Sequence, residues 1–346
     1  MIETGKWYEK SGNCGDVVCS TRVRLARNLK QFPFPAKATD PQREAVEQKV
    51  RDALLSGNSI LSKEFRFVPL ENASEEEAVS LVERHIVSPE FISDRRGKAV
   101  LISDDESISI MVNEEDHLRI QVLREGFSLK EAAETADRID TLLSETLDFA
   151  YDPEFGYLTQ CPTNLGTGMR ASVMLHLPAL TENGAMPRIA SNLSKLGLTL
   201  RGTYGEGSKS VGGLYQLSNQ ITLGLSENEA IENLRSITVQ LMEEERKARS
   251  QMAQDVAWQD KIDRAAGILK TARVLSSSEC MELLSYVRFG ISVGILQGVT
   301  TEELNGLMVN VQPGTLMAKA GKPLDQNQRD VLRATKVREV CAKIKE

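Results

Sequence analysis

Cysteine and histidine are scarce in this chain of 346 residues, which has five cysteines and three histidines. The cysteines are scattered, and no two of them have the Cys-x-x-Cys spacing of a zinc or redox site. The pattern favours reduced thiols in the cytoplasm over a disulfide framework. So few histidines also argue against a histidine-rich metal site, and we expect no metal ligands from the protein.

Long apolar runs are also missing. The most apolar window, 286–299, contains Arg288 and falls short of the ~18 residues that a transmembrane helix needs. The first nine residues have no apolar segment of the kind found in secretory signals. With 42 Lys+Arg against 49 Asp+Glu, the net charge is −7, which does not favour direct binding to nucleic acid or to an anionic membrane. We expect a cytoplasmic globular protein of about two domains.

The common nucleotide-binding motifs are absent. The sequence has no GxxxxGK[ST] loop, no GxGxxG after a strand, and neither the HRD nor the DFG element of ordinary protein kinases. The glycine-rich stretch 202–213 matches none of these motifs. Taken alone, it is typical of a flexible loop.

What the sequence does contain is clear helix and strand patterning. Capping signals such as Ser74 with Glu77 and Ser128 with Glu131 precede apolar periodic runs. Helices are predicted over 41–55, 75–87, 129–149, 227–253 and 279–297. Strands are predicted over 98–102, 108–113, 117–123, 171–177, 198–203 and 214–218, the first two joined as a hairpin through 103–107. Strands and helices do not alternate regularly, which favours an α+β fold with an antiparallel sheet. Residues 226–346 are predicted to be almost wholly helical, and we place a domain boundary near 250, giving domains 1–250 and 251–346.

Arginines recur in short polar segments. These are Ser20-Thr-Arg-Val-Arg24, the stretch from Asn113 to Arg119, Cys161-Pro-Thr-Asn-Leu-Gly-Thr-Gly-Met-Arg170, and Arg201-Gly-Thr-Tyr-Gly-Glu206. On a strand, Arg22 and Arg24 point to one face, as do Glu115, His117 and Arg119 if that segment is extended. One such arginine usually makes only a surface salt bridge. Five of them could hold a triphosphate without a P-loop, because guanidinium groups bind phosphate bidentately.

The four segments, in this order, resemble those of the phosphagen (guanidino) kinases, and the Cys161 segment is the most specific of them. The resemblance covers roughly residues 15 to 250. Small-molecule members of that family have a helical domain before the first arginine segment, whereas here the segment begins at Ser20 and a helical extension follows the catalytic region. This layout is similar to that of the bacterial protein-arginine kinase subfamily. In that subfamily the C-terminal domain dimerises and carries an Arg-Asp-x-x-Arg-Ala motif, which stands here at 329–334.

The resemblance implies a role for each segment. Glu115 is expected to be the principal base for the acceptor guanidinium, with Glu206 orienting its other edge and Cys161 beside it; Glu114 and Asp116 are expected to be structural. Residues expected to contact ATP are Ser20, Thr21, Arg22, Val23, Arg24, His85, Arg119, Arg170, Ala171, Ser172, Val173, Met174, Arg201, Gly202, Thr203, Tyr204, Gly205 and Glu206. For His85 a partly buried helix position is an equal alternative. Mg²⁺ would arrive with ATP, held mostly by phosphates and water.

The C-terminal motif has two interpretations. From the residues alone, Arg329 and Arg333 share a helix face that is expected to be charged and solvated. By resemblance, Arg329, Asp330, Arg333 and Ala334 form a phosphoarginine pocket that couples bound product to activity.

Several functions therefore stay open. The first expectation is an ATP-dependent protein arginine kinase that acts on exposed arginines. It would be a homodimer working with a zinc-binding activator and would mark proteins for a Clp protease in a stress response. The alternatives are a free-arginine kinase, a non-catalytic phosphoarginine-binding adaptor, and a helical dimerisation scaffold.

Overall fold

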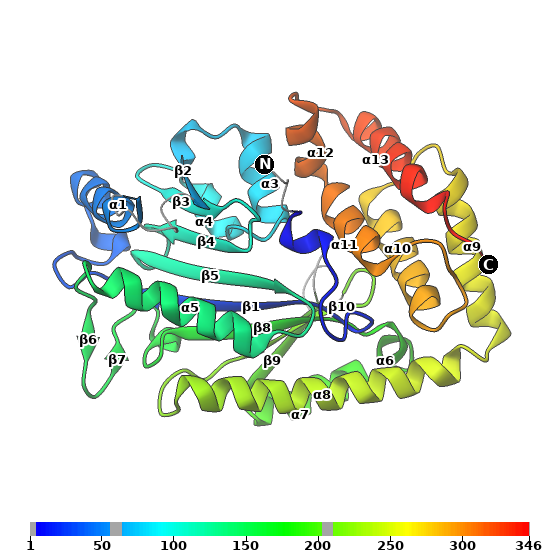
Figure 1. The fold of residues 1–346 in the computed structure, drawn as a ribbon, viewed down its shortest axis with the longest axis horizontal. Coiled ribbons are helices and arrows are strands. Elements are labelled where there is room, and N and C mark those ends of the chain that lie inside the picture. Colours follow the sequence, from blue (N-terminus) through cyan, green and yellow to red (C-terminus); the bar gives the residue numbers. More distant parts are fainter. Residues whose placement is uncertain (1–4, 56–63, 203–209, 346) are drawn as a thin grey trace.

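An eight-stranded antiparallel sheet forms the centre of the molecule, with helices on both faces (Figure 1). The computed structural model describes residues 5–55, 64–202 and 210–345. The strand order is β2-β3-β4-β5-β1-β8-β10-β9, so the first strand of the chain lies near the middle. The strands are β1 (Val18–Arg27), β2 (Phe65–Pro69), β3 (Ala99–Ser103), β4 (Ile108–Val112), β5 (Leu118–Glu125), β8 (Met169–His176), β9 (Leu198–Gly202) and β10 (Leu214–Asn219). The predicted α+β class and the hairpin through 103–107 are confirmed.

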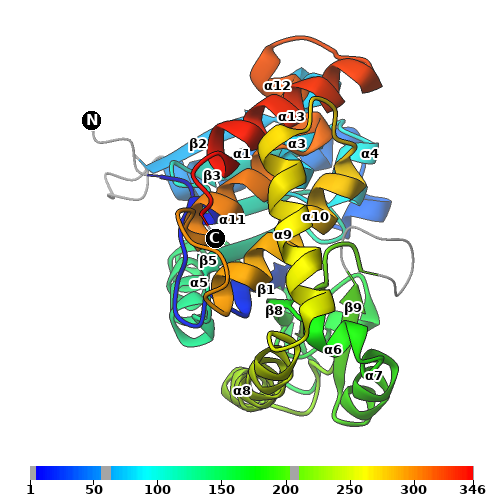
Figure 2. The same cartoon turned by 90° about the vertical axis from the view of Figure 1, so that its right-hand side faces the viewer.

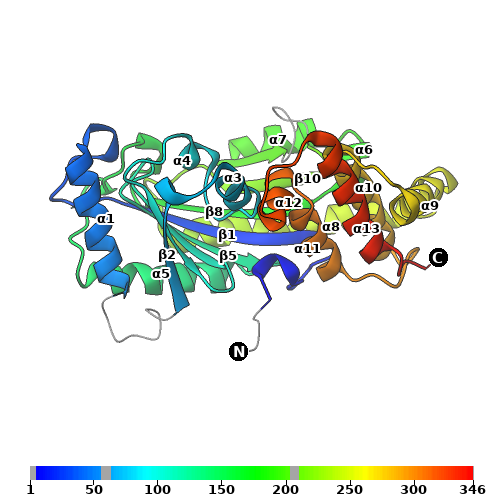
Figure 3. The same ribbon diagram turned by 90° about the horizontal axis from the view of Figure 1, so that it is seen from above.

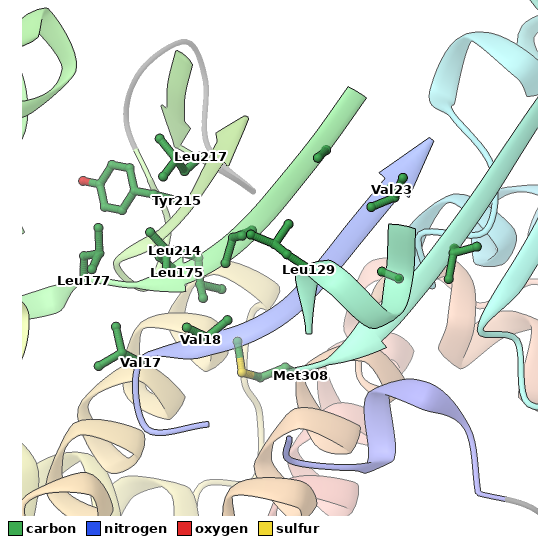
Figure 4. Packing of buried hydrophobic residues seen from close by; sticks show 14 of the residues in the cluster. Val17, Val18, Val23, Leu129, Leu175, Leu177, Leu214, Tyr215, Leu217 and Met308 are labelled. Atoms are coloured by element: carbon green, nitrogen blue, oxygen red, sulfur yellow. The ribbon is translucent and has the colours of Figure 1, made fainter. Parts of the chain in front are cut away.

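One face of the sheet is apolar and covered. Val23 of β1, Val173 of β8 and Leu217 of β10 are fully buried, because alternate strand residues point to the same side. Helices α5 (Leu129–Ser144) and α8 (Glu227–Met252) cover this face, and Figure 4 shows Leu129 among the buried strand residues. Helix α1 (Asp40–Leu55) packs against α5 and adds to the same core.

The other face is covered only in part. Helices α3 (Glu75–Glu83) and α4 (Pro89–Ser93) form a second, smaller core with β3 and β4, in which Leu81, Phe91 and Met111 are buried. The face above β5, β1, β8 and β10 stays open, and this opening positions the site described below. Two further helices, α6 (Pro178–Glu182) and α7 (Met186–Lys195), precede β9.

The last five helices gather at one end of the sheet, as the side view and the view from above show (Figure 2, Figure 3). They are α9 (Val256–Thr271), α10 (Ser277–Ser292), α11 (Thr301–Asn310), α12 (Pro313–Ala320) and α13 (Gln326–Cys341). The main core runs from the sheet into these helices, and Met308 of α11 belongs to the same cluster as Val18 of β1 (Figure 4). The predicted boundary near 250 lies in the last turns of α8, and the division into two domains stays a prediction.

The structure departs from the predicted elements at several places, and the helices predicted over 129–149 and 279–297 end early, at Ser144 and Ser292. The helix predicted over 75–87 ends at Glu83, because His85 adopts a left-handed φ of 62°. Ser128 makes no capping hydrogen bond with its side chain, and its hydroxyl donates to the Glu125 carbonyl instead. Residues 113–117 form a bend between β4 and β5 and are not extended. In the described part of the chain, no helix has the length and apolar character needed to span a membrane.

Candidate active site

A cavity of about 470 Å³ opens on the uncovered face of the sheet. Its floor is polar and comes from β1, β5, β8 and β10, and one wall comes from the segment that links α3 to α4. Gln312, which precedes α12, closes it from the C-terminal helices. The lining side chains used below are Ser20, Arg22, Arg24, Glu83, His85, Arg119, Gln121, Ser172, Met174, Gln216 and Gln312.

The strand register brings the predicted arginines onto this face. Arg24 of β1 lies opposite Arg170 of β8 and Gln121 of β5, and Arg22 lies opposite Ser172. Residues that lie opposite each other in neighbouring strands point to the same side of a sheet. Arg201 of β9 lies opposite Gln216 of β10, which lines the cavity, and Arg201 itself is exposed. The five predicted arginines therefore share one face.

The positive charge of this cluster is only partly compensated. The guanidinium of Arg22 donates to Gln216 at 2.7 Å, whereas the guanidinium of Arg24 makes no hydrogen bond within the described part of the chain, and Nε of Arg170 is buried without a partner. Burial lowers the pKa of Arg22 to about 10, and the charges of Arg119 and Arg170 add to this effect. Burial, followed by the charges of Arg22, Arg119 and Arg170, lowers the pKa of Arg24 as well. A partly buried cluster of cations whose charge is only partly compensated fits a polyanionic ligand such as a triphosphate.

Two carboxylates of the 113–117 bend meet this cluster at Arg119. Nη1 of Arg119 donates to Oε1 of Glu114 at 2.7 Å, and Nη2 lies 2.7 Å from Oε2 of Glu114 and 3.2 Å from Oε2 of Glu115. The Glu114 side chain is 6% exposed and that of Glu115 is 37% exposed. Glu114 can contact Arg119 directly because this segment bends and is not extended.

Glu115 is the accessible carboxylate of this pair. Burial raises its pKa, Arg119 opposes the rise, and the charges of Asp116 and Glu114 add to it. The backbone N–H of Gln160 donates to Asp116 and so joins the loop of Cys161 to that of Glu115, and both groups help to raise the pKa of Arg170 against the effect of burial. Cys161 is partly exposed, with its Sγ 3.1 Å from Oγ1 of Thr163. The structure thus gathers a carboxylate, a thiol and an arginine at one end of the site.

A buried network fixes the loops that carry Glu115 and Cys161. Oδ1 of Asp116 accepts from Nδ2 of Asn28 at 2.6 Å and from the backbone N–H of Gln160 at 2.8 Å. Asn28 also accepts from the backbone N–H of His117 at 2.9 Å. Asp116 therefore ties the bend after β4 to the residue before Cys161, as the structural role predicted for it requires.

His117 is part of the same network. Its Nδ1 accepts from the backbone N–H of Leu29 at 3.0 Å, so Nε2 carries the proton and donates to the Pro33 carbonyl at 2.9 Å. The side chain is fully buried. The expected face shared by Glu115, His117 and Arg119 does not form, because the segment is not extended.

His85 faces the cavity from the turn after α3. It lies beside Trp7, with the ring centroids 6.2 Å apart. Burial, together with the nearby charge of Arg22, lowers its pKa to about 4, so the imidazole is neutral near pH 7. The alternative of a histidine within a helix is wrong, because α3 has already ended.

The other predicted contact residues divide into three groups. Ser20, Ser172 and Met174 line the cavity. The side chains of Val23, Ala171 and Val173 are fully buried in the core on the opposite face, and the hydroxyl of Thr21 donates to the Gly126 carbonyl. Gly202 ends β9, and Thr203, Tyr204, Gly205 and Glu206 lie outside the described residues.

Sequence reasoning missed the glutamines of this cavity. Gln216 and Gln121 could have been found from strand alternation, because each lies opposite a cavity residue in a neighbouring strand. Gln312 carries no such signal, since only the packing of α12 brings it to the cavity. Gly314 allows that packing, because a Cβ there would lie 2.5 Å from Cγ1 of Val79 in α3.

The C-terminal motif lines a second cavity of about 390 Å³. Arg329 is partly exposed and donates to the Leu324 carbonyl at 2.7 Å. Arg333 is 1% exposed and donates to Asp330 and to the carbonyls of Val311 and Leu275. The solvated helix face expected from the residues alone is therefore wrong for Arg333, and Ala334 is fully buried. The start of α10 and Gln312 complete the cavity.

Comparison with known proteins agrees with this geometry. Residues 45–248 match the sequence model described as the ATP:guanido phosphotransferase C-terminal catalytic domain, and residues 255–346 match the protein-arginine kinase McsB C-terminal domain. The taurocyamine kinase of Schistosoma mansoni, solved with transition-state analogue components, superposes with a TM-score of 0.62 and 29% identity. That match covers 75% of this chain and 39% of that duplicated chain. A lombricine kinase gives a TM-score of 0.61 at 24% identity, covering 72% of this chain and 73% of its own, which supports the fold alone.

The chain therefore belongs to the ATP:guanido phosphotransferase family, and it is a phosphotransferase that acts on a guanidino group. Relatives that match nearly its full length are protein-arginine kinases. That of Clostridium acetobutylicum is 45% identical over 336 residues, covering 96% of this chain and 98% of its own. That of Moorella thermoacetica is 47% identical over 345 residues, covering 99% of each. The resemblance found in the sequence is confirmed.

Proposed function

We propose that this protein transfers the γ-phosphoryl group of ATP to the guanidinium of arginine side chains in proteins. The observation that carries the proposal is the position of Glu115 beside Arg119, which lines the cavity, with the loop of Cys161 tied to the same bend through Asp116. The nearly full-length similarity to protein-arginine kinases supports proteins as the acceptor class.

The cavity suits ATP in both charge and shape. Arg22, Arg24 and Arg119 would bind the phosphates of ATP. The apolar side chains of the cavity, which include Val87 and Met174, would contact its adenine ring. In the described residues, no three His, Cys, Asp or Glu side chains converge as a metal site. Mg²⁺ would enter with the nucleotide and neutralise part of the phosphate charge. The absence of protein metal ligands stays a prediction.

The chain's own groups account for the transfer. A guanidinium has a pKa above about 12, so one nitrogen must give up a proton before it can attack phosphorus. Glu115 accepts that proton, the N–P bond forms, and the bond from phosphorus to the leaving ADP oxygen breaks. The arginines stabilise the charge on the transferred group. The orienting role of Glu206 stays a prediction, since that residue lies outside the described part of the chain.

For the C-terminal cavity we propose phosphoarginine binding coupled to activity. Arg329 is the accessible cation, and the N-terminus of α10 lies beside it, a common place for phosphate. Gln312 lines both cavities, so it is a direct structural link between them. The homodimer, the zinc-binding activator, the Clp protease partner and the cytoplasmic location stay predictions.

The test is to incubate the purified protein with MgATP and a mixed-protein substrate, followed by mass spectrometry without acid. Phosphoarginine on the substrate is expected, and it should be absent with the Glu115→Gln variant. Phosphorylation of free arginine alone would favour the small-molecule kinase. Binding of phosphoarginine without any transfer would favour the adaptor.

A further inference from the structure

Exposed apolar side chains concentrate at the end of the sheet that carries Glu115 and Cys161. The strands β1, β4 and β10 end there, and β5, β8 and β9 begin there, as the register requires. Among the described residues, nine large hydrophobic side chains are exposed. Five of these flank the strand ends just named: Tyr151, Phe155, Leu196, Ile221 and Leu223.

Three neighbouring segments supply these five residues: a hairpin, the loop after β10, and the end of α7, where Leu196 lies. Tyr151 and Phe155, 59% and 46% exposed, lie on the hairpin of β6 (Tyr151–Asp152) and β7 (Gly156–Tyr157). Figure 1 shows this hairpin at the end of the sheet opposite the C-terminal helices. Leu223 lies in the loop after β10 and is 47% exposed.

Close backbone approaches connect the hairpin to the loop after β10. Gly166 lies between them, because a Cβ on Gly156 would meet its carbonyl oxygen at 2.4 Å and a Cβ on Gly166 would meet Cα of Leu223 at 2.8 Å. On the far side, a Cβ on Gly197 would meet Cδ1 of Ile221 at 2.6 Å, which places Leu196 next to that loop. We call these five side chains the apolar rim.

The apolar rim is continuous with the loop that carries Cys161. Oγ1 of Thr222, between Ile221 and Leu223, donates to the carbonyls of Thr163 and Leu165 at 3.0 and 2.6 Å. On the hairpin side, the guanidinium of Arg27 lies 3.4 Å from the ring centre of Tyr157 and donates to the Thr167 carbonyl at 3.0 Å. The rim is therefore held in a fixed position next to the groups that would receive the acceptor arginine.

Charge around the rim favours a basic chain. Residues 145–158 contain four acidic residues and no lysine or arginine. Of these, Glu145, Asp148 and Glu154 are exposed. A free amino acid would have no apolar atoms with which to cover side chains outside the catalytic pocket, whereas a polypeptide extends beyond its arginine on both sides.

Resting on the function proposed above, we infer that the apolar rim docks the acceptor polypeptide, through apolar side chains that flank the target arginine. The surface then selects arginines in apolar sequence surroundings, and the acidic residues near the hairpin favour segments with additional positive charge. Burial of apolar area supplies the affinity, and Glu115 and Cys161 receive the guanidinium.

The experiment compares two arginine peptides of equal length and net charge. One has leucine and phenylalanine around the arginine, and the other has only glycine and serine. Wild-type protein is expected to show a KM about tenfold lower for the apolar peptide, the change expected when one large side chain is covered. The double variant Phe155→Ser/Leu223→Ser should remove that difference, leaving kcat and the KM for the glycine–serine peptide unchanged.

The matched control is Val256→Ser, which changes a side chain that is 75% exposed at the start of α9. It should behave as wild type with both peptides. Equal KM values for the two peptides in wild-type protein overturn the docking surface. The docking surface is also overturned if the double variant keeps the lower KM for the apolar peptide, or if its only change is in self-association measured by sedimentation.

Two further outcomes are separated by design. If the double variant also loses activity on the glycine–serine peptide, the single variants Phe155→Ser and Leu223→Ser are measured instead. Each must reduce the difference in KM between the two peptides at unchanged kcat, and otherwise the inference is wrong. If wild-type protein phosphorylates neither peptide nor any protein, the proposed function itself fails.

Discussion

The guanidinium of Arg119 binds Glu114 through two nitrogen–oxygen contacts of 2.7 Å, but reaches Glu115 through one contact of 3.2 Å. Glu114 is thereby held as the buried partner of an arginine. Glu115 keeps an oxygen free of Arg119, on a side chain that is 37% exposed. Two adjacent glutamates of the same chemical type thus receive different roles from their surroundings.

This difference predicts distinct effects for two isosteric variants. Glu115→Gln removes the proposed base but keeps the shape, so kcat should fall by roughly 10²-fold or more while ATP affinity is kept. Glu114→Gln leaves Arg119 without its charged partner, so it should change the KM for ATP more than kcat. Initial-rate kinetics with both substrates varied checks this. Near-normal turnover in Glu115→Gln would contradict the assignment of the base.

The raised pKa of Glu115 predicts the acid limb of the pH profile. Transfer needs the ionised carboxylate, so kcat/KM should fall as pH decreases through a pKa above the ordinary value of 4.5. For stability the sign is opposite. The folded protein keeps this proton to a higher pH than the unfolded chain, so Glu115 weakens folding as pH rises through that window.

The matching measurement is thermal unfolding of Glu115→Gln across the same pH range. The variant should gain stability relative to wild type toward neutral pH and lose that gain in acid. An acid limb at or below 4.5 in the wild-type rate profile would show that another group limits the reaction.

Arg24→Ala should separate stability from binding. Arg24 is repelled by Arg22, Arg119 and Arg170. Removal of its charge should raise the melting temperature of the nucleotide-free protein and weaken ATP binding by about tenfold or more. Scanning calorimetry measures the melting temperature, and titration calorimetry measures the affinity for ATP. Arg24→Lys should restore only part of the affinity, because an ammonium lacks the bidentate fork. A lower melting temperature in Arg24→Ala would mean that the arginine is needed for the fold.

Asp116→Ala should uncouple the two catalytic loops. It removes the acceptor that holds Asn28 and the backbone of Gln160, so Glu115 and Cys161 lose their fixed separation. We expect kcat to fall by about 10²-fold, the usual cost of ~1 Å misplacement, with a smaller change in ATP affinity. Asp263→Ala, at an exposed position on α9, is the control. Equal losses in kcat and in ATP affinity would point to general unfolding.

In the C-terminal cavity, Arg329→Ala and Asp330→Ala should differ. Arg329 is partly exposed and donates to one carbonyl, so its loss should remove stimulation by phosphoarginine while basal activity stays measurable. Asp330 is the carboxylate partner of the buried Arg333, so Asp330→Ala should also lower stability, by about 3–5 kcal/mol. Initial rates with and without phosphoarginine, together with denaturant unfolding, test both. Unchanged stimulation in Arg329→Ala would contradict the proposed pocket.

Much of the site could be predicted from the sequence because strand alternation is a local rule. Arg22 and Arg24 had to share a face once the segment was a strand, and the covered face had to contain Val23. The same rule failed at 113–117, where Asn113 has a φ of 60° and turns the chain. That turn directs Glu114 to Arg119 and buries His117. The alternation of residues along the sequence does not predict such a turn.

By itself, the sequence determined the fold class, the arginine-bearing strands, the helical C-terminal region and the family. These features depend on residue type and on spacing over a few positions along the chain. Only the tertiary structure decided that Glu114 binds Arg119, that Arg333 is buried, and that Gln312 closes the catalytic cavity. Strand register and helix packing join residues that are far apart in the chain, and short-range patterns do not specify those contacts.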